Sequence, residues 1–255
     1  MSKKHIDHAF QEKLAKNEKL FIPYIMAGDG GLENLDERIE FLQSCGADAV
    51  ELGIPFSDPV ADGPTIQAAG LRALANGTSL TGVFQTLKNR KTRNIPIILM
   101  TYFNPIYIYG VERFAKECEE AGVDGVIIPD LPMEEEALVD DFLKENSIAF
   151  IRLAALTSDA KRLSKIAKRT EGFLYAVSVA GTTGAKTSHG ENVKDFLKNL
   201  NEIANVPVLA GFGVSSSDQA NELGASCDGV IVGSTIVDLF HKGKRDEIRK
   251  LIQLT

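Results

Sequence analysis

The sequence predicts a (β/α)8 barrel, also called a TIM barrel, with an extra helix at its N-terminus. Short apolar runs alternate with amphipathic stretches along all 255 residues, and eight such units can be counted. Eight strand-plus-helix units in about this length are what the barrel requires. The apolar runs are nearly continuous in Val, Ile, Leu, Phe and Ala, as in parallel strands covered by helices. A doubly wound open sheet uses the same alternation and is the alternative.

The predicted strands follow from these apolar runs. They cover residues 21–26, 47–52, 96–101, 124–129, 149–153, 173–178, 206–210 and 228–232. The extra amphipathic helix covers roughly the first seventeen residues. Because no composition break or Pro/Ser-rich linker divides the chain, we expect residues 1–255 to form one barrel domain.

The segments between the strands carry helical spacing. Apolar residues recur at i, i+3, i+4 and i+7 in 111–118 and 193–203, and over a shorter span in 163–167. Gly46, Gly122 and Gly224 each stand where a helix should end before the next strand, which predicts left-handed helix stops. Ser216, with Gln219 three residues later, predicts a capping box.

Composition excludes several classes of function. A formal charge of −7 gives no electrostatic basis for binding nucleic acid or an anionic membrane. Cys45, Cys118 and Cys227 form no Cys-x-x-Cys pair, so we expect buried core cysteines rather than disulfides or a metal site. The N-terminus lacks an export signal and no apolar run reaches membrane-spanning length, so a cytoplasmic location is expected.

Three glycine-rich segments follow the last predicted strands, at 178–190, 210–217 and 232–238. Glycine allows backbone N–H groups to approach an anion, and barrels often bind phosphate in the loops after strands seven and eight. Gly213, Gly233 and Ser234, with Gly184 as a fourth, are therefore the candidate phosphate residues. The alternative is that such turns only cap the strands. Three of them at one end of a barrel favour phosphate.

The segment ELGIPFSDPVADGP (51–64) places carboxylates at the end of a buried strand. Strand alternation puts Glu51 on the face opposite Val50 and Leu52, so it should point into the barrel near its mouth. A carboxylate there needs a raised pKa or a partner, and either condition suits proton transfer. A structural ion pair is the equal alternative for Glu51, and an ordinary turn or helix cap is the alternative for Asp62.

Aromatic residues complete the predicted mouth. Tyr24, Tyr102 and Tyr175 fall at or near the ends of strands one, three and six, where they would suit a flat aromatic substrate. His5 and His8 are expected on a solvated helix face. From the residues alone, the chain is a barrel enzyme that acts on a phosphorylated small molecule by carboxylate acid/base chemistry, and its reaction stays open.

At this point ELGIPFSDPVADGPTIQ (51–67) resembles the signature of the tryptophan synthase alpha chain family. FIPYIMAGD (21–29) and ILMTYFNPIYIYG (98–110) resemble its first and third strand regions, and GFG (211–213) and VGS (232–234) its phosphate loops. The resemblance covers essentially the whole chain. It implies a carbon–carbon lyase of tryptophan biosynthesis, which cleaves indole-3-glycerol phosphate to indole and glyceraldehyde 3-phosphate by a retro-aldol reaction.

The resemblance also implies partners and roles. The family works in an α2β2 complex and passes indole to a beta chain that holds pyridoxal phosphate (PLP), so this chain itself would need no cofactor. Glu51 would be the general acid/base and Asp62 its catalytic partner. The residues around the phosphate and the substrate would be Gly184, Gly213, Gly233 and Ser234, and Tyr24, Tyr102, Tyr175, Thr183 and Phe212. Thr183 would contact Asp62 when its loop closes.

The chain departs from relatives in one loop, where 181–184 read Gly-Thr-Thr-Gly instead of Gly-Val-Thr-Gly and Val179 replaces an arginine that some members carry. Two other readings stay open. The chain can act mainly as an allosteric partner of a beta chain with little chemistry of its own. It can also be another phosphate-binding barrel enzyme of amino-acid biosynthesis, although those typically use a lysine acid, which no strand end here shows.

Overall fold

The computed structural model describes residues 2–90, 94–178 and 191–253. Eight parallel strands close into a barrel in chain order, because β8 pairs with β1. The strands are β1 Leu20–Met26, β2 Val50–Gly53, β3 Ile97–Met100, β4 Gly125–Ile127, β5 Ala149–Ala155, β6 Leu174–Val177, β7 Val208–Gly211 and β8 Gly229–Val232. All eight predicted strands and the barrel are confirmed, and the closure excludes the open sheet.

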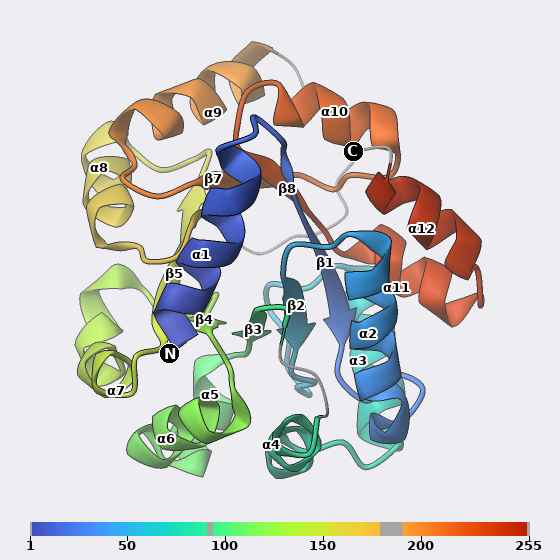
Figure 1. The fold of residues 1–255 in the computed structure, drawn as a ribbon. Coiled ribbons are helices and arrows are strands. Elements are labelled where there is room, and N and C mark those ends of the chain that lie inside the picture. The colour runs from blue at the N-terminus through green and yellow to red at the C-terminus, as the bar shows by residue number, and fades with distance from the viewer. Residues whose placement is uncertain (1, 91–93, 179–190, 254–255) are drawn as a thin grey trace.

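Helices follow the strands and form the outer ring in Figure 1. They are α1 Ser2–Leu14, α2 Leu35–Cys45, α3 Pro64–Ala75, α4 Leu80–Lys88, α5 Phe103–Tyr109, α6 Val111–Ala121, α7 Asp140–Glu145, α8 Ala160–Arg169, α9 Glu191–Ile203, α10 Ser217–Gly224, α11 Ser234–His241 and α12 Arg245–Gln253. Two short 3-10 helices are η1 Leu32–Asn34 and η2 Met133–Leu138. The expected helices at 111–118, 163–167 and 193–203 are α6, α8 and α9.

Strand alternation divides the core into two layers. Outward-facing side chains such as Val50 and Leu52 of β2 pack under the helices. Inward-facing ones such as Ala49, Ile98 and Leu209 fill the barrel itself. Because Glu51 lies between Val50 and Leu52 on β2, the same alternation turns it inward, as predicted.

The extra N-terminal helix is confirmed, and it closes one end of the barrel. Ile6 and Phe10 of α1 are fully buried against the inward-facing side chains, and Figure 1 shows α1 (dark blue) lying across the ring of strands. The expectation that His5 lies on a solvated face is wrong. It is half-buried, and its Nδ1 lies 3.2 Å from the Asp124 carboxylate, whereas His8 is exposed as expected.

The loops before three strands contain an aspartate whose side chain bonds to the neighbouring strand, a pattern that the sequence did not reveal. Asp48, Asp124 and Asp228 each accept a hydrogen bond from a backbone N–H in the preceding strand, at 2.7, 3.0 and 2.8 Å. These carboxylates fasten neighbouring strands at the N-terminal face. The charges of these three residues therefore serve stability rather than chemistry, which sits at the opposite face of such barrels.

The predicted helix ends are confirmed only in part. Gly46 and Gly122 end their helices in the left-handed conformation, with φ of 102° and 69°. Gly224 does not: it is the last helical residue of α10, and the right-handed Ala225 follows it. β2 also begins three residues later than predicted, because the Ala47 N–H still bonds back to Leu42 of α2.

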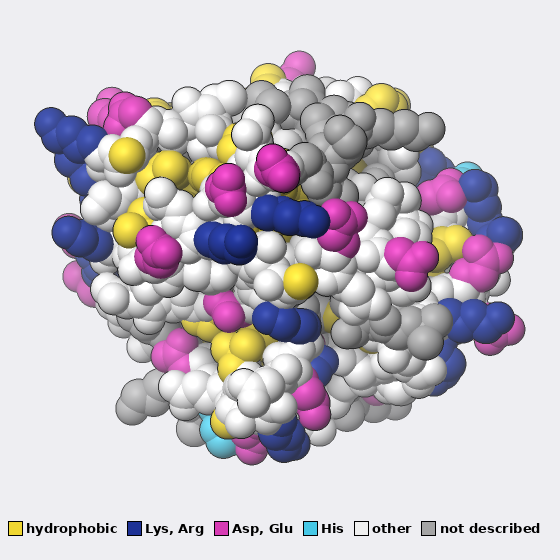
Figure 2. All heavy atoms as spheres, turned by 90° about the horizontal axis from the view of Figure 1, so that it is seen from above, with side chains coloured by type: hydrophobic (Ala, Val, Ile, Leu, Met, Phe, Trp, Pro, Cys, Tyr) yellow, Lys and Arg dark blue, Asp and Glu magenta, His cyan; other side chains and the backbone are white. Residues whose placement is uncertain are grey.

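The upper face of the molecule carries charged side chains of both signs. Figure 2 shows acidic and basic side chains interspersed on the upper face rather than gathered into one patch. All three cysteines are buried and outside any disulfide, as predicted. Among the residues that the structure describes, no helix is both long and apolar enough to span a membrane.

Candidate active site

A pocket opens at the carboxyl ends of the strands, the face where barrels carry their chemistry. Its volume is about 460 Å³, including the space open to solvent. The described residues that line it are Tyr24, Glu51, Asp62, Ile66, Met100, Tyr175, Gly211, Gly213, Ile231, Gly233 and Ser234. Seven of these are predicted site residues, brought together from five strands and the loops that follow them.

Glu51 occupies the wall of this pocket on β2. Its side chain is 1% exposed, and neither carboxylate oxygen has a hydrogen-bond partner among the described residues. Burial, with a smaller contribution from the negative charge of Asp62, raises the pKa of Glu51 to about 8. An ion pair across the barrel, the structural alternative, is absent from the described part of the chain. At neutral pH this group is mainly a neutral acid that can donate a proton.

Asp62 stands in the segment between β2 and α3. Burial raises its pKa to about 6, while a hydrogen bond from the Tyr102 hydroxyl opposes that rise. Gln67 of α3 donates to the Asp62 backbone carbonyl at 2.7 Å. Asp62 is therefore largely ionised at neutral pH beside a largely protonated Glu51. Two carboxyl groups with separated titration ranges are the usual mark of an acid/base pair.

Two tyrosines enter the pocket through space that glycines leave. A Cβ atom on Gly53 would fall 1.9 Å from the Tyr24 hydroxyl, and one on Gly211 would fall 2.2 Å from Cε2 of Tyr175. Each glycine at the end of its strand therefore gives room to a ring from the neighbouring strand. Burial is also the main cause that raises the pKa of both tyrosines, so both hydroxyls stay neutral.

Three of the four predicted phosphate residues, Gly213, Gly233 and Ser234, line the same pocket. Gly233 precedes α11, and Ser234 is the first residue of that helix. Gly213 follows β7 in the left-handed conformation, with φ of 70°. The helix start offers backbone N–H groups and the positive end of its dipole. The Ser216 cap of α10 is confirmed by its bond from the Gln219 N–H, but Gln219 reaches back to Ser215 rather than to Ser216.

The other predicted residues have different positions. Thr183 and Gly184 lie outside the described residues. Tyr102 is not in the pocket lining, because its hydroxyl is directed at Asp62 and Ala61. Phe212 is 2% exposed and packs edge-on against Phe196 of α9, with ring centroids 6.4 Å apart. Its side chain thus belongs to the layer outside the barrel rather than to the pocket.

Four lining residues were missed. Met100 and Ile231 are inward-facing strand residues, which alternation alone could have placed, and Gly211 ends β7. Ile66 lies on α3, directly after the segment that carries Asp62. Together with Tyr24, the apolar side chains of Ile66, Met100 and Ile231 give the pocket a surface suited to a flat apolar ring.

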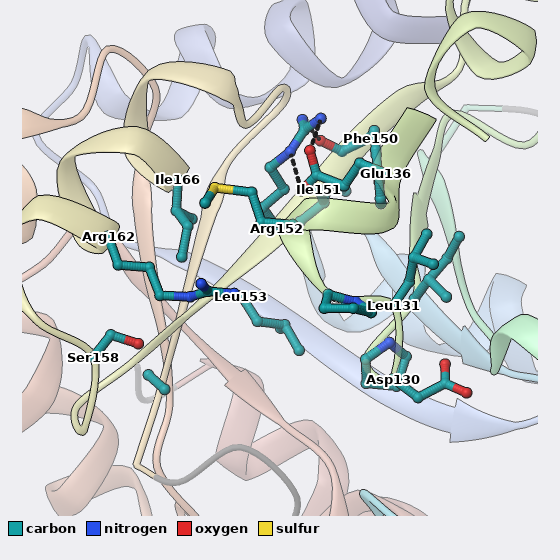
Figure 3. Close-up of a pocket in the computed structure, with 15 residues that line it drawn as sticks. Asp130, Leu131, Glu136, Phe150, Ile151, Arg152, Leu153, Ser158, Arg162 and Ile166 are labelled. Carbon is teal, nitrogen blue, oxygen red and sulfur yellow. Dashed lines mark hydrogen bonds and ion pairs between the residues drawn. The ribbon is translucent and has the colours of Figure 1, made fainter. Parts of the chain in front are cut away.

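A second hollow of about 800 Å³, including the space open to solvent, lies between the loop after β4, strand β5 and helix α8 (Figure 3). Its buried Arg152 donates to Glu136, Asp140 and the backbone carbonyls of Phe150 and Arg169, which uses all five of its N–H groups. Arg162 pairs with Glu134. The hollow therefore offers little free polar chemistry. The described residues also contain no group of three or more His, Cys, Asp or Glu side chains that could hold a metal ion.

Comparisons with known proteins place this geometry in context. The family model described as "Tryptophan synthase alpha chain" matches residues 10–255. A tryptophan synthase alpha chain of Oceanobacillus iheyensis is 58% identical over 254 residues, covering 99% of this chain and 97% of the relative. One from Bacillus cereus is 52% identical over 239 residues, covering 93% of each.

Solved structures agree. The alpha subunit of Legionella pneumophila tryptophan synthase superposes with a TM-score of 0.89 at 33% identity, covering 98% of this chain and 96% of that one. A chain of the Pyrococcus furiosus tryptophan synthase α2β2 complex gives a TM-score of 0.82 at 38% identity, covering 92% and 96%. The similarity thus extends over nearly the full length of sequence and fold.

Proposed function

The chain belongs to the tryptophan synthase alpha chain family, and from this premise we propose that Glu51 and Asp62 carry out its reaction. The family cleaves indole-3-glycerol phosphate to indole and glyceraldehyde 3-phosphate, a carbon–carbon lyase reaction of retro-aldol type. The observation that carries the proposal is the buried Glu51, without a hydrogen-bond partner among the described residues, in one pocket with Asp62. A protonated acid and an ionised carboxylate are the two groups that this reaction needs.

Glu51 performs both proton transfers. As a neutral acid it protonates C3 of the indole ring, which makes the ring a leaving group. The resulting carboxylate then removes the proton from the glycerol hydroxyl while the C–C bond breaks. The bonding electrons return to the ring as indole, and the hydroxyl carbon becomes the aldehyde. A pKa of about 8 keeps Glu51 protonated at the start and still basic enough for the second step.

Asp62 acts on the ring nitrogen. Protonation at C3 places positive charge on the indole N–H, and an ionised carboxylate that accepts its hydrogen bond stabilises that charge. Thr183, which is outside the described residues, would contact Asp62 in the closed state. Gly213, Gly233 and Ser234 would bind the phosphate with Gly184, and Tyr24 and Tyr175 would flank the ring.

We further propose an α2β2 complex in which a beta chain receives the indole and holds the PLP for its own reaction. Three large apolar side chains, one in the loop after β2 and two on helix α5 after β3, support a docking surface near the mouth. Val60, Tyr107 and Ile108 are 72%, 66% and 77% exposed. Large apolar side chains exposed on the segments that follow neighbouring strands are typical of a protein interface.

The decisive experiment is a Glu51→Gln variant assayed with indole-3-glycerol phosphate, alone and with a beta chain. We expect indole release to fall by about a thousandfold or more, because Gln cannot transfer a proton, while substrate binding is retained. Glu134→Gln, at an exposed carboxylate outside the pocket lining, is the control and should keep full activity. Appreciable turnover by Glu51→Gln would refute the assignment.

The same assay separates the alternatives. A chain that only activates a beta chain would release no indole by itself under any condition, and Glu51→Gln would leave that activation intact. Another phosphate-binding barrel enzyme would turn over a different phosphorylated substrate. For the docking surface, Ile108→Asp should weaken the complex in sedimentation experiments. Leu71→Asp, at an equally exposed apolar residue on α3, should not.

A further inference from the structure

We infer that Asp130 and Tyr102 form a brace across the loops after β4, β3 and β2, and that this brace positions the Asp62 carboxylate. The inference rests on the proposed role of Asp62 and adds two positioning residues to it. Neither residue lines the pocket around Glu51. Each acts through the next: Asp130 fixes the start of α5, and Tyr102 at that start holds Asp62.

The Tyr102 hydroxyl makes hydrogen bonds to two consecutive residues. It accepts a hydrogen bond from the Ala61 N–H at 3.0 Å and donates one to the Asp62 side chain. The rest of the tyrosine is immobilised: it is 4% exposed, and its ring packs on Phe56 with centroids 5.4 Å apart. One phenol thus fixes both the backbone before Asp62 and the carboxylate itself.

Asp62 needs such a contact because its segment has little regular structure. No helix or strand lies between the end of β2 at Gly53 and the start of α3 at Pro64. The bonds from Gln67 to the Asp62 carbonyl and from the Asp62 N–H to Pro59 fix the backbone only. Tyr102 is the hydrogen-bond partner that acts on the carboxylate among the described residues.

Asp130 fixes the element that carries Tyr102. Its Oδ1 accepts a hydrogen bond at 2.9 Å from the N–H of Phe103, the first residue of α5, and Tyr102 is the N-cap of that helix. Tyr102 makes no capping bond with its side chain, so the helix start is held from the neighbouring loop. Figure 3 shows the Asp130 carboxylate directed away from Arg152 and Arg162, so no cation of that hollow competes for it.

The titratable groups facing Asp62 come from four elements. They are Glu51 on β2, Tyr24 on β1, Tyr175 on β6 and Tyr102 before α5. Of these, Tyr102 makes the hydrogen bond that lowers the pKa of Asp62, against the effect of burial. Loss of this bond should therefore raise that pKa and leave less ionised Asp62 at neutral pH.

The test measures Asp62 directly, by carboxyl ¹³C NMR titration of the full chain labelled at aspartate. Tyr102→Phe keeps the ring and should move the Asp62 midpoint upward by roughly half a pH unit or more. Asp130→Ala should move it in the same direction. Asp130→Asn retains an acceptor for the Phe103 N–H and should stay near the wild type. Asp159→Ala is the matched control, because Asp159 caps α8 through its bond from the Arg162 N–H at 2.8 Å.

Kinetics with indole-3-glycerol phosphate then test the consequence. We expect kcat to fall about fivefold in Tyr102→Phe and Asp130→Ala with little change in KM, and the double variant to be no worse than Tyr102→Phe alone. Three results would overturn the brace. The first is an Asp62 titration that does not change in Asp130→Ala, and the second is a kcat of Asp130→Asn as low as that of Asp130→Ala. The third is a double variant whose loss of kcat is the sum of the two single losses. The NMR titration needs no turnover. An inactive wild type would therefore refute the proposed function, and the Asp62 titrations would still show whether the brace exists.

Discussion

Glu51 and Asp62 face one pocket, yet burial raises the pKa of Glu51 to about 8 and that of Asp62 only to about 6. The difference has a structural cause. Glu51 has no hydrogen-bond partner among the described residues, whereas Asp62 receives a hydrogen bond from Tyr102 that favours its charged form. The proton that the two sites compete for therefore resides on Glu51, the strand residue, rather than on Asp62 in the loop.

The first prediction concerns the pH dependence of kcat/KM for indole-3-glycerol phosphate. Activity needs Asp62 ionised and Glu51 protonated, so it should rise with pH through about 6 and fall again through about 8. Steady-state rates between pH 5 and 9 measure both limbs. Asp62→Asn should lose activity and also the acid limb, and a profile that stays flat to pH 9 would contradict the role of Glu51.

The second prediction is that Glu51 costs stability at alkaline pH. Its pKa is about 8 in the folded chain against 4.5 in the unfolded chain, so between these values the folded state binds more protons. Stability therefore falls as pH rises through this range, by a few kcal/mol in total. Glu51→Gln should raise the free energy of unfolding by that amount above pH 8.5 and hardly at all near pH 4. Urea unfolding at both pH values measures the difference, and equal effects would argue against it.

The third prediction separates two glycines of the pocket. A Cβ on Gly211 would fall 2.2 Å from the Tyr175 ring, so Gly211→Ala should displace that ring and lower kcat by about tenfold. A Cβ on Gly233 would lie 3.6 Å from Cβ of Tyr24, an ordinary contact. Gly233→Ala should therefore fold normally, and its added methyl should raise KM for the phosphorylated substrate. Steady-state kinetics distinguish these results, and unchanged kinetics in Gly233→Ala would argue against its contact with phosphate.

Much of the fold could be predicted from the sequence because two periodicities repeat eight times. Each buried apolar run predicts one of the strands β1 to β8, and each amphipathic stretch between them predicts a helix. Strand alternation also correctly predicts that Glu51 points into the barrel. Boundaries were less accurate where side chains replace backbone pairing. β2 begins only after 47–49, because Ala47 still bonds to α2 and because Asp48 accepts a hydrogen bond from the Phe21 N–H. A pattern of hydrophobicity shows neither contact.

A residue's place in the pocket was predictable where it follows from a strand, from a glycine-rich loop or from the motif at 51–67. Tyr24, Glu51 and Tyr175 lie on strands, and the structure brings them together. Tyr102 and Phe212 lie just beyond strand ends, where the direction of a side chain depends on tertiary contacts. The Tyr102 hydroxyl turns to Asp62, and the Phe212 ring turns to Phe196 of α9. His5 shows the same limit, because helical spacing does not reveal the carboxylate of Asp124 that lies beside α1.

The fourth prediction is that the N-terminal face affects stability but not chemistry. Asp124 is 4% exposed, accepts a hydrogen bond from the buried Ile97 N–H and contacts His5. Asp124→Ala leaves that N–H unpaired and should cost about 1 to 3 kcal/mol of unfolding free energy.

The hydrogen bond to Asp124 raises the pKa of His5, so this part of the stability is present below about pH 6.5 and is lost as pH rises through the folded-state pKa. The loss in Asp124→Ala should thus be larger at pH 5.5 than at pH 8.5 in urea unfolding. Asp124→Asn, which keeps an acceptor, should lose less. Because Asp124 lies at the end of the barrel opposite the pocket, kcat per folded molecule should remain at the wild-type value, and a lowered kcat with unchanged stability would show that the two faces are coupled.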